Sequence, residues 1–216
     1  MMEILHVSCS PRGRAAESYR LSRKIIDLLL RSEPAATVVD RVIGEGLMPH
    51  IDAGYALAQH SPMARVPHEG AIARSEALIR ELERSDVVVI GTPMHNLTVP
   101  SALKAWIDHV VRVRRTFNVT PDGKVGALHD RPVFVAVSSG GRYSGKHARQ
   151  PDFLTPYLKA ILGTIGLHDL TFFSVEGSAL APDALAEARA KTDRALQEHF
   201  SSFRPSSRSA DQWASA

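Results

Sequence analysis

Residues 86–108 have the sequence DVVVIGTPMHNLTVPSALKAWID. The run 87–90 is β-branched and apolar on both faces, as in a central parallel strand that helices cover on each side. Pro100 suits the first turn of a helix, which we expect over 101–112. Residues 93–100 therefore form a loop at the carboxyl end of a buried strand. Ligands of open α/β sheets bind at this edge, so the loop is the first candidate for a functional site.

Strand-like and helix-like segments alternate along most of the chain. The pattern of apolar residues predicts strands over 4–7, 37–40, 86–92, 132–138 and 170–175. It predicts helices over 17–31, 75–84, 101–112, 153–165 and 183–203. A short helix near 55–60 is expected within a long excursion over 41–74, and Pro121-Asp-Gly predicts a hairpin within 115–125. This alternation predicts an α/β fold, a flavodoxin-like doubly wound five-stranded parallel sheet in three α/β/α layers.

The composition is that of one globular domain. A chain of 216 residues, 44% of them apolar, can bury a large core without disulfides or a structural metal. We assign residues 1–200 to this domain and expect 201–216, which is rich in serine, to be a flexible tail. The single cysteine and the start of the chain in a strand, instead of a signal sequence, favour a cytoplasmic location.

Several kinds of partner are not supported by the sequence. No apolar run reaches the roughly 20 residues that a membrane-spanning helix needs. The 26 lysines and arginines exceed the 23 acidic residues by only three, and no basic stripe interleaves with aromatic residues. We therefore expect no membrane and no nucleic-acid partner. The histidines lack the spacing of metal ligands, so no metal is expected.

A loop of small residues follows the first strand. Ser10 and Ser18 lie in the segment 8–18, which leads into a helix. Hydroxyls and unpaired backbone N–H groups at a helix N-terminus bind phosphate. The same residues are also common in ordinary helix capping, so the loop has two interpretations. A nucleoside-triphosphate loop is not expected, because the Gly-Lys-Ser/Thr pattern is missing.

Two further loops of unusual composition follow the third and fourth strands. In the loop 93–97, Met94 could line a planar ring and Asn96 could contact its polar edge, although the loop could also be only a rigid turn. Gly140 and Gly141 would let backbone come close to a ligand, but glycine pairs also end strands for local reasons. All three loops open onto the same carboxyl edge of the predicted sheet, which makes a shared site the better explanation.

These motifs resemble those of the FMN-dependent NADH-azoreductase family of flavodoxin-like quinone and azo reductases, over roughly residues 3–200. That family has a serine-containing phosphate loop, a Pro-Met-Tyr-Asn-Phe loop and a Ser-Arg-Gly-Gly loop. The resemblance implies that FMN binds to the matching residues of this chain. They are Ser10, Ala16, Glu17, Ser18, Pro93, Met94, His95, Asn96, Leu97, Ser138, Ser139, Gly140 and Gly141.

The resemblance also implies an activity. NADH or NADPH would reduce FMN and leave before a quinone or azo compound enters the same slot, and a homodimer would close the site. The flavin carries the electron chemistry, so no catalytic side chain is required. Phe117 and Val119 are expected in the substrate pocket. His95 could donate a proton, but we favour a place in the pocket wall, because solvent can also supply that proton.

The chain departs from the family pattern at a few of these positions. The differences are at Ala16, Glu17, His95, Leu97, Val119 and Ser139. His95, Leu97 and Val119 replace residues that are usually or often aromatic. The replacements by Leu97 and Val119 predict a wider acceptor pocket. Glu17 replaces a neutral polar residue. Its carboxylate is expected to point to solvent, with only its N–H engaged, because an inward carboxylate would repel a phosphate.

Two questions stay open from the sequence alone. Arg112, Arg114 and Arg115 could contact the phosphates of NAD(P)H, or they could be solvated or face a second subunit. The fold would also suit a flavodoxin-like electron carrier or a flavin-free binding module. Such carriers are typically strongly acidic, whereas this chain has a formal charge of +3.

Overall fold

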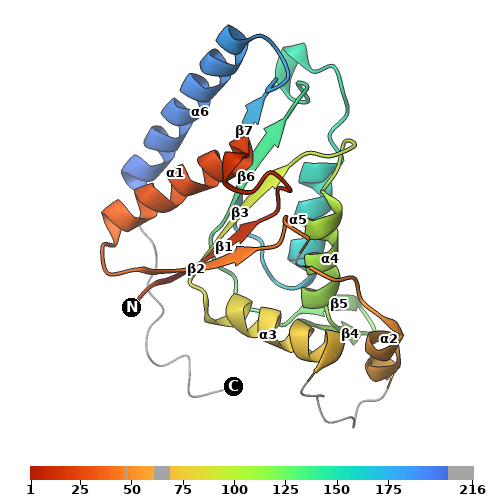
Figure 1. Ribbon diagram of the computed structural model, residues 1–216. Helices are drawn as coiled ribbons and strands as arrows, with labels where there is room; N and C mark the ends of the chain where they lie inside the picture. Colours follow the sequence, from red (N-terminus) through yellow and green to blue (C-terminus); the bar gives the residue numbers. More distant parts are fainter. Residues whose placement is uncertain (47, 61–68, 204–216) are drawn as a thin grey trace.

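The computed structural model describes residues 1–46, 48–60 and 69–203. Among these residues, five parallel strands form one sheet in the order β2-β1-β3-β6-β7, and β4 and β5 form a separate antiparallel hairpin (Figure 1). The strands of the sheet are β1 Glu3–Ser8, β2 Thr37–Val42, β3 Val87–Pro93, β6 Val133–Ser139 and β7 Leu170–Glu176. Those of the hairpin are β4 Phe117–Thr120 and β5 Gly123–Gly126. The order is that of a flavodoxin-like doubly wound sheet.

Helices cover both faces of the sheet and complete the three predicted layers. α1 (Glu17–Ser32) and α6 (Pro182–Ser202) lie on one face (Figure 1). The other face is covered by α3 Gly70–Arg84, α4 Ser101–Val110 and α5 Leu154–Thr164. The core is accordingly divided in two, with one apolar cluster under each set of helices. The short α2 (Ala53–His60) lies in the predicted excursion.

The central strands are buried throughout. All seven residues of β6 are buried, as are those of β3 except Pro93. The edge strand β2, by contrast, has no buried residue. A strand packed on both faces must be apolar at every position, which is why the sequence 87–90 is a continuous β-branched run.

The structure corrects two predicted helix boundaries. α3 begins at Gly70, five residues before the predicted start, and Ala71 in this extra turn is buried. α4 ends at Val110 instead of residue 112, because the Thr116 hydroxyl donates to the Val110 carbonyl at 2.6 Å. The helix predicted over 183–203 is confirmed, since α6 spans Pro182–Ser202 and so includes the first two residues of the predicted tail.

The predicted tail therefore starts too early. The ring of Phe203, just beyond α6, lies 5.3 Å from the ring of Phe134 on β6 and joins a cluster with Phe173 and Phe200. These aromatic contacts hold residues 201–203 on the domain. The rest of the predicted tail, 204–216, lies outside the described residues, as do residues 47 and 61–68 of the excursion.

A buried ionic cluster joins α3 to the segment after α4. Arg112 is 8% exposed and donates to Glu76 Oε2 at 2.5 Å and to Ser75 Oγ at 2.9 Å. Arg115 donates to Glu76 at 3.0 Å and to Glu83 at 2.5 Å. Both guanidinium groups are thus bound to carboxylates of their own chain. This is a structural role, and it argues against the alternative in which these two arginines bind NAD(P)H phosphates.

The same cluster controls the ionisation of Glu76. Burial alone would raise the pKa of its carboxyl, but hydrogen bonds from Arg115 and Arg112 outweigh burial and lower the pKa to about 2. An unfolded glutamate has a pKa near 4.3. The cluster therefore stabilises the fold above about pH 4.3, and this contribution is lost as the pH falls toward 2.

We predict that Glu76→Gln lowers the free energy of unfolding by about 3 kcal/mol at pH 7, because it leaves the Arg112 guanidinium buried without a charged partner. Urea unfolding at pH 7 and pH 3 measures the effect, which should shrink at the lower pH. Glu33→Gln, at an exposed site at the end of α1, is the control and should change stability by less than about 0.5 kcal/mol. Equal losses in the two variants would contradict the prediction.

Candidate functional site

The first predicted loop ends in a helix N-terminus that no side chain caps. A 3-10 turn, Gly13–Ala15, precedes α1, and the N-cap residue is Ala16, which has no polar side chain. The first N–H groups of an α-helix have no partner within the helix, so the start of α1 presents donors. Ser10 holds the loop in place from the other side, since its hydroxyl accepts from the N–H of Arg12 at 3.2 Å.

The Ser18 hydroxyl lies at this helix start and has no protein partner. Its residue is fully buried, and within the part of the chain that the structure describes, its oxygen makes no hydrogen bond. A buried hydroxyl without a partner is costly, which indicates that a ligand supplies the missing bond. Together with the uncapped N–H groups, the hydroxyl forms a site suited to an anion such as phosphate.

The carboxylate of Glu17 does not point to solvent, which corrects the sequence-based expectation. Its side chain is only 11% exposed, and it accepts from Arg20 at 2.6 Å and from Arg189 of α6 at 2.6 Å. Burial favours the neutral form of Glu17, yet hydrogen bonds from Arg189 and Arg20 lower its pKa overall. The carboxylate is therefore ionised and bound to two guanidinium groups. The negative charge of Glu17 is therefore balanced by Arg20 and Arg189, and not by solvent as the sequence analysis expected.

The loop after β3 is a tight turn with a strained backbone. His95 and Thr98 exchange two backbone hydrogen bonds of 3.0 Å across the turn. The two residues between them have left-handed backbones, with φ of +47° at Asn96 and +70° at Leu97. Asparagine tolerates this region, but leucine does so rarely, and such strain gathers at functional sites. His95 and Asn96 are exposed, so the tip of the turn is accessible to a ligand.

The loops after β3 and β6 are held against each other. The Met94 N–H donates to the Ser138 carbonyl at 2.8 Å. Gln150, which the sequence did not single out, donates from Nε2 to Ser139 Oγ at 3.1 Å and lies 3.2 Å from the sulfur of Met94. These contacts make one continuous surface of the two loops, as the sequence predicted for this sheet edge.

The two glycines of the loop after β6 differ in their surroundings. The carbonyls of residues 139–141 accept from N–H groups of the turn 177–179, which fixes the loop. A Cβ added at Gly141 would lie 2.4 Å from the Gln150 side chain, so the absence of a side chain there serves packing. At Gly140 an added Cβ would meet only Ala179, at 3.4 Å, and Gly140 is exposed. The open space at Gly140 suits the approach of a ligand.

Phe117 and Val119 lie away from the three loops of the same chain. Both belong to the hairpin, which Figure 1 places beside the carboxyl-terminal end of α4. The loop 93–97 precedes the other end of this helix, and ten helical residues span about 15 Å. Phe117 is 8% exposed and belongs to the core, whereas Val119 is 67% exposed. A single chain therefore does not bring Val119 to the candidate flavin loops.

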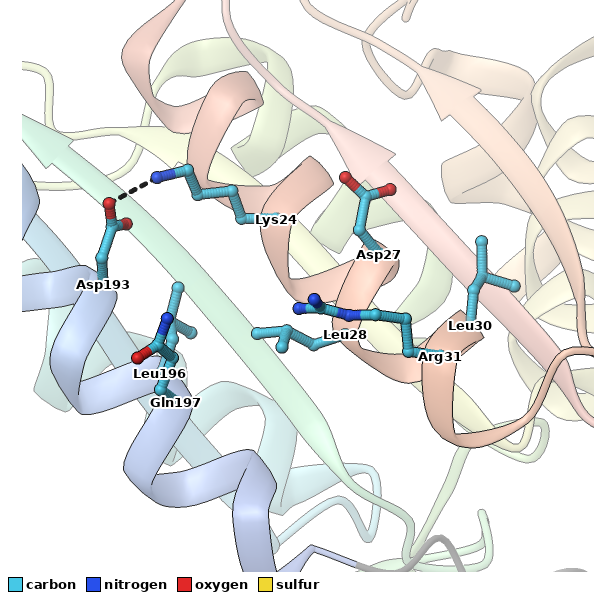
Figure 2. A pocket seen from close by; sticks show the side chains of 8 residues that line it. All are labelled: Lys24, Asp27, Leu28, Leu30, Arg31, Asp193, Leu196 and Gln197. Carbon is cyan, nitrogen blue, oxygen red and sulfur yellow. Dashed lines mark hydrogen bonds and ion pairs between the residues drawn. The ribbon is translucent and has the colours of Figure 1, made fainter.

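A cavity of about 480 Å³ lies elsewhere, between α1 and α6 (Figure 2). Its lining combines charged and leucine side chains, and Lys24 of α1 donates to Asp193 of α6 at 2.5 Å across it. It contains none of the residues of the three loops. We place the functional site at the sheet edge, because the uncapped helix start, the unpartnered hydroxyl and the strained turn all lie there.

Comparison with known proteins identifies the family. The model of a family described as flavodoxin-like fold matches residues 2–200. A Burkholderia lata protein named FMN-dependent NADH:quinone oxidoreductase 5 is 50% identical over 187 residues, which cover 86% of this chain and 89% of the relative. The chain belongs to the FMN-dependent NADH:quinone oxidoreductase family. A further member, FMN-dependent NADH:quinone oxidoreductase 4 of Pseudomonas fluorescens, is 45% identical over 196 residues, or 90% of this chain and 92% of the relative.

Solved structures of azoreductases have the same fold. The azoreductase of Bacillus anthracis superimposes with a TM-score of 0.82 at 24% identity, over 94% of this chain and all of that one. A second structure from this organism, an FMN-dependent NADH-azoreductase in complex with FMN, has a TM-score of 0.75 at 23% identity over 92% and 99%. The resemblance to the azoreductase family and the flavodoxin-like fold predicted from the sequence are thereby confirmed.

Two features of the described residues bear on other classes of function. Of the helices in the described ranges, none combines the length and the apolar character that crossing a bilayer requires. The same part of the chain contains no group of three or more histidine, cysteine, aspartate or glutamate side chains placed to hold a metal ion.

Some residues of the site could not have been found from sequence patterns. Arg189 contacts Glu17 although the two residues are 172 positions apart in the sequence, and no local motif indicates this pairing. Gln150 lies in an irregular loop between β6 and α5, where only the fold brings it to Met94. The sequence did contain one indication that Glu17 has a basic partner. A carboxylate at a helix start beside an anion site requires a counter-charge.

We predict that Asn96→Val lowers the free energy of unfolding by about 1–2 kcal/mol, because a β-branched residue is disfavoured in a left-handed backbone. Thr98→Val, in the same turn at a residue whose backbone is not left-handed, is the matched control and should cost less than about 0.5 kcal/mol. Urea unfolding compares the two. If both variants lose the same stability, the strained turn is not the cause.

Proposed function

We propose that this protein is an FMN-dependent oxidoreductase that transfers electrons from NADH or NADPH to quinones and azo compounds by a ping-pong mechanism. The observation that carries the proposal is the anion site at the start of α1, with its uncapped N–H groups and the unpartnered buried hydroxyl of Ser18. Family membership supports it, since relatives up to 50% identical are named FMN-dependent NADH:quinone oxidoreductases.

The residues of the three loops fit the parts of FMN. The phosphate would take hydrogen bonds from the Ser18 hydroxyl and from the N–H groups at Glu17 and Ser18, beside Ser10. The Ala16 N–H already donates to the Gly13 carbonyl at 3.1 Å, so Ala16 would only border the phosphate. The flavin ring would lie against the loops 93–97 and 138–141, with Met94 and the exposed Gly140 at its surface. When bound, FMN supplies the electron transfer itself, and the chain binds and orients the reactants.

Reduction of an acceptor also needs a proton, and His95 is the titratable side chain at the tip of the strained turn. It is exposed there, so it could donate a proton or form part of the pocket wall. We favour the wall, because exposure gives solvent the same access. The open tip also suits a ping-pong mechanism, in which the nicotinamide and the acceptor use one slot in turn.

The proposal includes a homodimer and a cytoplasmic location. The hairpin of one chain lies at the far end of α4 from its own flavin loops, so a second copy would be needed to bring Val119 to the acceptor. Val119 and Val125 of the hairpin are exposed apolar residues, 67% and 52%, which is suited to a subunit contact. A single cysteine cannot form a disulfide within the chain, which suits a reducing compartment.

The cofactor is tested by colour and by titration. We predict that the purified protein is yellow and that the apoprotein binds FMN in a fluorescence titration. Gly140→Ala and Gly140→Val should raise the Kd for FMN, in that order and by about tenfold or more for valine, because each adds atoms where the ring lies. Melting temperatures should change little, since an added Cβ meets only Ala179 at ordinary distance.

Gly54→Ala, at an exposed glycine of α2, is the control and should leave the Kd unchanged. A colourless protein that binds no FMN would overturn the oxidoreductase proposal and favour a flavin-free binding module. Binding of FMN without oxidation of NADH in the presence of any quinone or azo acceptor would favour an electron carrier. Equal FMN affinity in all three glycine variants would contradict the placement of the ring.

The acceptor preference is tested at two positions where aromatic residues are usual in the family pattern. Leu97→Phe and Val119→Tyr should each raise the ratio of azo-dye to benzoquinone kcat/KM by about twofold to tenfold, since an aromatic contact contributes about 0.5–1.5 kcal/mol. A compact quinone can rest on the flavin alone and should gain less. An unchanged ratio in both variants at equal FMN content would contradict the idea of a wide acceptor pocket.

A further inference from the structure

The carboxylate of Glu17 is bound on two sides. Arg189 donates from Nη2 to Oε2 at 2.6 Å and from Nε to both oxygens at 3.1 and 3.2 Å. Arg20, one turn along α1, donates from Nη2 and Nε to Oε1 at 2.6 and 2.8 Å. Glu17 is therefore an acceptor shared by α1 and α6, and its side chain is 11% exposed.

This carboxylate lies at an unfavourable place for a protein that binds a phosphate. Glu17 is the first residue of α1, and the next residue is Ser18, whose buried hydroxyl has no partner within the described residues. A negative charge at a helix N-terminus competes with an anion for the same partial positive charge. Two guanidinium groups on one carboxylate reverse this effect, because the three side chains together have one net positive charge.

We propose that Arg189 is a positioning residue for the phosphate of FMN: it holds the Glu17 carboxylate away from the anion site and keeps the charge beside that site positive. This inference rests on the proposed function. Arg189 contacts no ligand in this scheme and acts through Glu17. Arg20 alone would neutralise Glu17, but it would leave no excess positive charge and would bind only one of the two carboxylate oxygens.

A second ion pair between the same helices provides a matched control. Lys24 of α1 and Asp193 of α6 bridge the cavity in Figure 2. Lys24 follows Glu17 by seven residues, which places it about 10 Å farther along α1 from the phosphate end. Removing Lys24 weakens the contact between α1 and α6 without changing the charge beside the anion site.

The test measures binding of FMN and of riboflavin, which has the same ring but no phosphate, to the apoproteins by quenching of flavin fluorescence. Arg189→Met should raise the Kd for FMN by about tenfold, as expected for one partly screened charge near an anion. The Kd for riboflavin should stay within about twofold, because the ring lies against other loops. Arg189→Lys keeps the charge and should restore most of the FMN affinity, and adding Glu17→Gln to Arg189→Met should restore it as well.

Each outcome decides the inference. A selective loss of FMN affinity in Arg189→Met, with Lys24→Met unchanged, supports it. Equal losses for FMN and riboflavin, or the same loss in Lys24→Met, would assign Arg189 a purely structural role and overturn it. Unchanged FMN binding in Arg189→Met would also overturn it, while the proposed function stands because the unaltered protein still binds FMN. Failure of the unaltered apoprotein to bind FMN would overturn both.

Discussion

Strand β3 has a parallel neighbour on each side and helices packed on both of its faces. Burial of this kind leaves only the two ends of the strand to present polar groups, and the loop 93–97 leaves the sheet at the carboxyl end. Because β1 and β6 run parallel to β3, the loops that follow them leave at the same edge. Backbone hydrogen bonds from Met94 to Ser138 and from Cys9 to Gly91 then hold the starts of these three loops close together. The position of the candidate site follows from the burial of one strand.

Much of the fold could be predicted, because it depends on signals within short stretches of sequence. Every strand of the sheet was expected from a short stretch rich in apolar residues, and the alternation with helices predicted the layers. The errors were at boundaries, where contacts between distant segments decide. The predicted tail began at residue 201, within α6, because no local pattern in the serine-rich end indicates that Phe203 packs against Phe134.

The candidate site was predictable to a lesser extent. Its backbone elements come from motifs within loops, such as 93–97, which the sequence could identify. Its charges come from pairs across the fold, which the sequence could not. Glu17 illustrates the difference, since its position at the helix start is local, whereas its partner Arg189 lies on the last helix. The same applies to Arg112, whose local cluster suggested an anion ligand but whose partner on α3 makes it part of the core.

The ion pair between Glu17 and Arg189 connects a helix that is synthesised early with the last helix of the domain. Residues 1–18 leave the ribosome before α6, which contains Arg189, has been synthesised. Until Arg189 emerges, the first turn of α1 holds a carboxylate with only Arg20 beside it. In the proposed scheme, a chain that lacks α6 would therefore bind FMN weakly. Tight binding of FMN would begin only when α6 packs against α1. A ligand bound at the N-terminal loop would thus report that synthesis of the domain is complete.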